Sequence, residues 1–176
     1  MGAINKNFAG SIYEASVGLG IHPLFITAMT CLESDWGRKS VLEHNLFGER
    51  YEEPWNGGRK LIRVTEIHPS VPKLLEGEFV VSKSTLNDGM IKYIIMRWYK
   101  DYHSIRECLC DHIRVFDQFP NAMKYKGDAH EFPKKLSNEP FIGKNGQKLY
   151  KKYDSSPNYS KYIEIMYKTL LKLGIK

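Results

Sequence analysis

A single carboxylate, Glu33, ends an apolar helical pattern and is followed closely by Trp36 and Gly37. An aromatic ring packed against a carboxylate removes water from it, which disfavours the charged form and raises the pKa. A carboxyl group that keeps its proton near neutral pH is what a glycosidase uses to protonate a leaving glycosidic oxygen. We therefore predict that Glu33 is a general acid; the alternative is a solvated residue at a helix end.

A second carboxylate, Glu66, lies on a predicted strand over residues 61–67. Strand alternation places Ile62, Val64 and Glu66 on one face, so that Glu66 could face Glu33 across a cleft. A separation of about 5–5.5 Å between the carboxyl groups would support a nucleophile, whereas about 6.5–9.5 Å would leave room for a water molecule. The sequence leaves both open, and an exposed strand residue is the alternative for Glu66.

The elements that must position these groups follow from hydrophobic periodicity. Helical patterns cover residues 8–19, 23–33, 104–116 and 159–173, and strand patterns cover residues 61–67, 78–81 and 94–99. Gly37 is expected to end the second helix in a left-handed conformation, and Ser104 with Glu107 forms a capping box. The stretch from 117 to 157 is predicted to be irregular. Helices, a small sheet and helices again predict an α+β fold with a cleft between two lobes.

Size and composition agree with one domain over residues 1–176, with a β lobe over approximately 50–99. No apolar run is long enough to span a bilayer, and no signal peptide is visible. The three cysteines do not make a disulfide framework, and Cys31 is expected to be buried. The histidines show no metal-ligand spacing, so we predict no metal and no cofactor. His112, on an apolar helix face, is predicted to be a satisfied core residue rather than a catalyst.

The runs LESDWG at 32–37 and NLFG at 45–48 resemble the glucosaminidase family, glycoside hydrolase family 73. Further pieces follow in the family's order: Thr65-Glu66, Arg97-Trp98-Tyr99 and Tyr153 before the last helix. The resemblance covers roughly residues 8–172 and is most specific over 32–48. It implies a lysozyme-like fold, mainly helical with a small inserted antiparallel β lobe. It also implies cleavage of peptidoglycan at the β-1,4 bond after N-acetylglucosamine.

By position, Glu33 resembles the family's general acid and Glu66 its proposed second carboxylate. Tyr153 resembles the tyrosine that holds or stabilises the reacting N-acetyl sugar. Because the β region is longer than is typical of the family, Glu76 or Glu78 compete with Glu66 for the second role.

Four further residues are predicted to contact substrate. Asn45 and Phe47 resemble the loop that shapes the cleft wall beside the acid. Trp36 is added as the ring that follows Glu33 closely, and Trp55 because exposed aromatic faces stack on pyranose rings. For each aromatic residue, packing in the core is the alternative.

The resemblance implies a monomer acting on peptidoglycan glycan strands at the bacterial cell wall, in the periplasm or outside the cell. The route of export stays open, with a secretion apparatus, a phage particle or an immunity protein as candidate partners. The rival functions are a lytic transglycosylase or muramidase on the same fold, or a non-catalytic wall-binding or structural module of a phage or secretion apparatus. A nucleic-acid-binding domain would rest on the net charge of +6 alone, without a reading motif.

Overall fold

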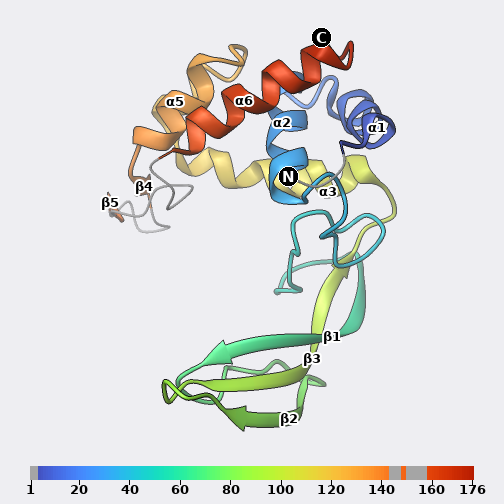
Figure 1. Cartoon of the computed structure of the whole chain (residues 1–176), viewed down its shortest axis with the longest axis vertical. Helices are drawn as coiled ribbons and strands as arrows, with labels where there is room; N and C mark the ends of the chain where they lie inside the picture. The colour runs from blue at the N-terminus through green and yellow to red at the C-terminus, as the bar shows by residue number, and fades with distance from the viewer. Residues whose placement is uncertain (1–3, 143–147, 150–157) are drawn as a thin grey trace.

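The computed structural model describes residues 4–142, 148–149 and 158–176, which fold into a helical lobe and a β lobe (Figure 1). The helices are α1 (Lys6–Ser16), α2 (Pro23–Glu33), α3 (Ile105–His112), the 3-10 helix η1 (Ile113–Gln118), α4 (Pro120–Met123), α5 (Glu131–Asn138) and α6 (Tyr159–Lys172). The strands are β1 (Gly58–His68), β2 (Phe79–Thr85), β3 (Ile91–Asp101), β4 (Phe141–Ile142) and β5 (Lys148–Leu149). The predicted α+β, lysozyme-like fold is confirmed.

Helix α2 is the centre of the helical lobe. Every residue from Leu24 to Cys31 is buried, as expected of a helix that is apolar around its whole circumference. Phe25 packs edge-on against Phe116 and Phe132, with ring centroids 5.7 and 4.8 Å apart. The C-terminal end of α2, which is Glu33, points toward the β lobe (Figure 1). The core therefore fixes the position of the helix end that carries the predicted acid.

A left-handed turn ends α2 directly after Glu33. Asp35, Trp36 and Gly37 have φ values of 51°, 60° and 83°. Ser34 holds this turn, because its hydroxyl donates to the Thr30 carbonyl at 2.6 Å and accepts from the Gly37 amide at 2.9 Å. The expectation for Gly37 is confirmed, and the two residues before it share its conformation.

The β lobe is a three-stranded antiparallel sheet in the order β1-β3-β2. β1 and β3 pair along their whole length, from Gly58 opposite Asp101 to His68 opposite Ile91. The three predicted strands are confirmed and run longer than expected at most ends. Alternate residues of β3 are buried on one face: Tyr93, Ile95, Arg97 and Tyr99.

The stretch from 117 to 157 was predicted to be irregular, and this prediction is wrong for its first part, where η1 ends and α4 and α5 form. The amide of Ala122 at the start of α4 donates to the carboxylate of Glu139 at 2.6 Å. Asp128 accepts from the His130 and Glu131 amides at the start of α5. Because Glu139 follows Ala122 by 17 residues, no local sequence pattern indicates this cap.

The predicted capping box at α3 is confirmed in modified form. The Glu107 amide donates to the Ser104 hydroxyl at 3.1 Å. The Glu107 carboxylate accepts from the His103 amide at 2.7 Å, one residue before the expected donor.

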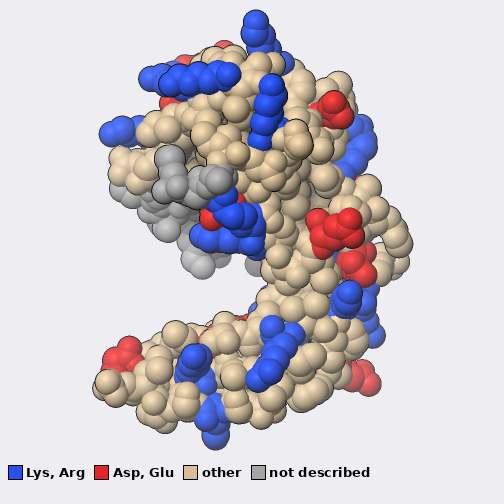
Figure 2. Space-filling model, turned by 45° about the vertical axis from the view of Figure 1, so that its right-hand side comes forward, with Lys and Arg blue, Asp and Glu red and all other residues tan. Residues whose placement is uncertain are grey.

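A deep cleft separates the two lobes on one side of the molecule (Figure 2). Lys and Arg side chains stand on both sides of its mouth (Figure 2). In the part of the chain that is described, none of the helices has the length and apolar character needed to cross a membrane.

The turn after Glu33 yields a stability prediction. A Cβ at Gly37 would lie 2.7 Å from the Phe8 ring, whereas Gly20 has a similar φ of 87° with nothing within 4 Å. We expect Gly20→Ala to cost about 1–2 kcal/mol for its positive φ alone. Gly37→Ala should cost a further ~1–3 kcal/mol from overpacking. Urea unfolding of both variants measures the difference, and equal losses would contradict the predicted contact with Phe8.

Candidate active site

Glu33 reaches the surface at the end of α2, with 31% of its side chain exposed. A titratable neighbour is His112, whose Nε2 lies 4.0 Å from Glu33 Oε2. His112 belongs to the last turn of α3, so two helices meet at this point. The predicted acid is therefore exposed on one side and faces an imidazole on the other.

His112 lies between two carboxylates. Its Nδ1 is 2.8 Å from Glu49 Oε1, while its Nε2 faces Glu33. The ring stacks on Phe47 with centroids 3.6 Å apart and planes 8° apart, and only 11% of the side chain is exposed. The prediction that His112 is a core residue is met only in part, because the residue is half-buried at the edge of the core and lies between two carboxylates. Phe47 thus supports this ring, in the position that the resemblance assigns to the cleft wall.

Asn45 is fully buried and fixes Glu49. Its amide nitrogen donates to the carbonyls of Glu49 and Lys100, both at 2.8 Å. Its amide oxygen accepts from the Glu49 amide at 2.7 Å. Asn45 therefore ties this loop to the end of β3.

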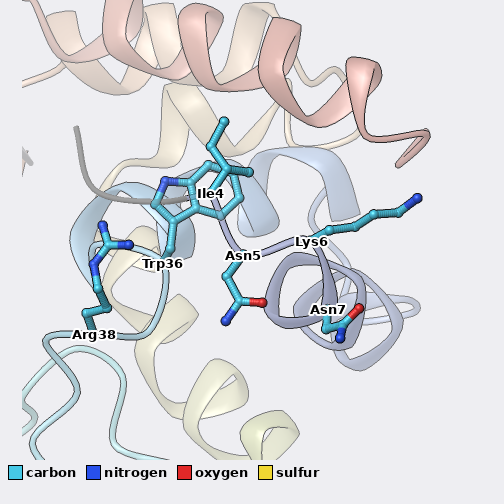
Figure 3. A pocket seen from close by; sticks show the side chains of 6 residues that line it. All are labelled: Ile4, Asn5, Lys6, Asn7, Trp36 and Arg38. Atoms are coloured by element: carbon cyan, nitrogen blue, oxygen red, sulfur yellow. The ribbon is translucent and has the colours of Figure 1, made fainter.

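The two predicted tryptophans lie apart from one another. Trp36 is only 6% exposed and belongs to the helical core. One edge of Trp36 reaches a pocket of about 440 Å³ beside the start of α1 (Figure 3). The pocket is lined by Ile4, Asn5, Lys6, Asn7, Trp36 and Arg38.

Trp55 lies at the root of the β lobe. Its indole nitrogen donates to the Gly58 carbonyl at 3.0 Å, and its ring packs edge-on against Tyr102. The ammonium group of Lys100 lies 4.8 Å from the ring centroid. Trp55 thus joins the chain that enters the β lobe to the chain that leaves it.

Glu66 forms a two-pronged ion pair with Arg97 inside the β lobe. Arg97 Nε and Nη2 donate to the two carboxylate oxygens of Glu66 at 2.6 and 2.9 Å, and His68 lies 2.7 Å from one of them. The hydrogen bonds from Arg97 lower the pKa of Glu66 to about 2. The side chain of Glu66 is 19% exposed, and the lowered pKa favours its ionised form at neutral pH.

Glu78 completes this cluster from the buried side. Its side chain is 0% exposed and accepts from Arg97 and from the Leu75 and Trp98 amides. Burial acts to raise the pKa of Glu78, but these hydrogen bonds outweigh it and hold the pKa below its usual value. Of the two competitors for the role of Glu66, Glu78 is closed off from solvent, and Glu76 is exposed.

Sequence reasoning missed three residues of these clusters: Glu49, His112 as a charged partner, and Arg97. Arg97 lies on the buried face of β3, and a buried arginine needs a carboxylate partner to compensate its charge. The alternation of the strand therefore indicated that Arg97 is paired. The pairing of Glu49 with His112 spans 63 residues and has no local signature.

Tyr153 lies outside the described residues, so its predicted role is untested. Among residues 4–142, 148–149 and 158–176, no three His, Cys, Asp or Glu side chains are grouped so as to hold a metal ion. Cys31 is buried, as predicted, and burial raises the pKa of its thiol to about 12.

A helical lobe, a small β lobe, a cleft between them and a carboxylate on each lobe are typical of a glycoside hydrolase with a lysozyme-like fold. Comparison with protein families supports this class. The glucosaminidase model, described as mannosyl-glycoprotein endo-beta-N-acetylglucosaminidase, matches residues 9–172, and the chain belongs to this family.

Two curated relatives are each named peptidoglycan hydrolase FlgJ. The protein from Vibrio parahaemolyticus is 22% identical over 127 residues, which are 68% of this chain and 35% of the relative. The protein from Vibrio cholerae is 25% identical over 127 residues, which are 68% of this chain and 32% of the relative. The chain thus spans about a third of the length of these relatives. No solved structure gave a match.

The ion pair of Glu66 with Arg97 predicts acid-sensitive stability. Since the folded-state pKa of Glu66 is about 2 against 4.5 for the free group, the pair stabilises fully above pH 4.5 and loses this contribution as the pH falls toward 2. We expect wild type to exceed Glu66→Gln by about 2–3 kcal/mol at neutral pH and by much less near pH 3. Urea unfolding across this range measures the difference.

A matched control is Glu131→Gln, which removes an exposed pair with Lys134. Its effect should stay within about 0.5 kcal/mol at every pH. A gap between wild type and Glu66→Gln that does not change with pH would overturn the assignment of the ion pair.

Proposed function

We propose that this chain hydrolyses the glycan strand of peptidoglycan at the β-1,4 bond after N-acetylglucosamine, with Glu33 as general acid. The observation that carries the proposal is the position of Glu33 at the end of α2 that points toward the β lobe, within a chain of the glucosaminidase family. The names of the two FlgJ relatives support peptidoglycan as the substrate. Lys and Arg at the cleft mouth suit a polymer that carries carboxylates (Figure 2).

The backbone around Glu33 favours an acid that holds its proton. The C-terminal end of a helix carries partial negative charge from its aligned peptide dipoles, and this disfavours a second negative charge beside it. Glu33 is the last residue of α2 and experiences this field. Proton transfer to the leaving oxygen would then stabilise the oxocarbenium-like transition state.

Glu66 is proposed as the ionised partner. A carboxylate with a pKa of about 2 is a weak proton acceptor, but its negative charge can stabilise positive charge on the sugar or orient a water molecule. Participation of the substrate's own N-acetyl group is the alternative route. In either route Tyr153 is proposed to hold the N-acetyl sugar.

The substrate-binding candidates take different parts in this proposal. Phe47 and Asn45 form the wall beside the acid, and Trp55 stands where the β lobe begins. Trp36 acts through the turn that sets the direction of Glu33. The proposed place of action is the bacterial cell wall, and the delivery route and partners stay open.

Digestion of purified peptidoglycan followed by mass spectrometry tests the proposal. Wild type should release fragments with reducing-end N-acetylglucosamine. Glu33→Gln should fold with unchanged stability and lose activity by at least about a hundredfold, because an amide cannot supply the proton. Glu14→Gln, on the exposed side of α1, is the glutamate control and should cleave like wild type.

The products separate the rival activities. Anhydro-muramyl ends would identify a lytic transglycosylase, and reducing-end N-acetylmuramic acid would identify a muramidase. Near-native activity of Glu33→Gln would refute the acid assignment. Binding to cell walls without cleavage by any variant would identify a non-catalytic module.

A further inference from the structure

The side chains of Glu49, His112 and Glu33 lie next to one another in this order. They come from the loop that contains Asn45, from α3 and from α2. Glu49 Oε1 lies 2.8 Å from Nδ1 of the imidazole, and Glu33 Oε2 lies 4.0 Å from Nε2 on its other side. A carboxylate only accepts hydrogen bonds, so Nδ1 carries a proton that it donates to Glu49. Nε2 is on the other side of the ring, toward Glu33.

The imidazole is held in this orientation by its surroundings. Phe47 covers one face at 3.6 Å between centroids, and Phe116 meets the ring edge-on at 6.3 Å. Asn45 holds the backbone of Glu49 at both its amide and its carbonyl. Rotation of the ring would therefore break the hydrogen bond to Glu49, and the geometry keeps Nε2 turned toward Glu33.

Other charges near the ring are already paired. Asp111, the neighbour of His112 on α3, accepts from Lys100 at 2.6 Å and from the Tyr102 hydroxyl at 2.7 Å. Two carboxylates from different elements face the ring, Glu49 from the loop and Glu33 from the end of α2.

We propose that Glu33 and His112 share one proton, and that His112, oriented by Glu49, is the positioning residue that keeps this proton available for catalysis. The proton resides either on Glu33 Oε2 or on His112 Nε2, and the total number of protons is the same in both states. The present 4.0 Å is longer than a hydrogen bond, so exchange requires an approach of about 1 Å or one bridging water molecule.

The proton balance of hydrolysis agrees with this role, which rests on the proposed function of Glu33. Glu33 gives one proton to the leaving oxygen as the glycosidic bond breaks. The attacking water loses one proton as its oxygen bonds to the sugar, and the Glu33–His112 pair regains one before the next turnover. Nε2 of His112 faces the carboxyl group of Glu33. His112 is therefore proposed to act through the acid and not to activate the attacking water.

Two substitutions test the roles of the two ring nitrogens separately. His112→Asn retains a donor for Glu49 but leaves nothing at the place of Nε2, and His112→Gln places a neutral amide near Nε2. Neither amide can hold the shared proton. We expect both variants to reduce kcat by about tenfold or more with little change in KM. The alkaline limb of the pH–rate profile should move to lower pH, because the proton then has one site instead of two.

The matched control is His130→Asn. His130 forms a similar pair with Glu164, at 2.9 Å from Nδ1 to Oε1, but its side chain is 59% exposed and the pair joins α5 to α6. This variant should keep both the rate and the pH profile. An unchanged profile in both His112 variants, with loss of activity that follows loss of stability, would refute the proposal.

Nitrogen-15 NMR of labelled histidine provides a readout independent of activity. The spectrum of His112→Asn identifies the His112 signals in wild type. Glu33→Gln should shift the titration of His112 Nε2 and leave His130 unchanged. Identical titration of His112 in wild type and Glu33→Gln would show that no proton is shared.

The activity measurements and the NMR titration together distinguish this inference from the proposed function. Cleavage that depends on Glu33 but not on His112 would leave the function standing and refute the sharing. Coupled titration of Glu33 and His112 in a protein that cleaves no peptidoglycan would support the sharing and refute the proposed function.

Discussion

The buried amide of Asn45 is the interaction on which the site and the junction of the lobes depend. It binds the backbone of Glu49 on one side and the Lys100 carbonyl of β3 on the other. Loss of this amide would remove a hydrogen-bond partner from the Glu49 amide and from the Lys100 carbonyl, at a cost of up to about 1–3 kcal/mol each. One side chain thus connects the helical lobe to the β lobe and places the carboxylate that orients His112.

The two lobes are stabilised by different forces. In the helical lobe, aromatic and aliphatic side chains pack around α2, with Phe25, Phe116 and Phe132 in mutual contact. In the β lobe, the buried guanidinium of Arg97 stands where a larger sheet would place an apolar layer, and Glu66 and Glu78 neutralise it. Environments that treat two carboxylates differently are how glycosidases separate a proton donor from an ionised partner.

The fold was predictable where its signals are local, and less so where they are not. Alternation and periodicity indicated β1 to β3 and helices α1, α2, α3 and α6, while α4 was missed because its cap comes from Glu139, which is distant in the sequence. The place of Glu33 at a helix end was predictable from the apolar stripe and Gly37. The partnership of His112 with Glu49 was not, because packing of the whole helical lobe brings them together.

The pairing of Gly58 with Asp101 has a consequence for how such proteins diversify. Since paired residues of neighbouring strands lie only about 5 Å apart, the chain enters and leaves the sheet at almost one point. The whole β lobe is thus a module inserted at a single position of the helical scaffold. Lengthening it, or exchanging it for another, would change the floor of the cleft without altering the path of any helix.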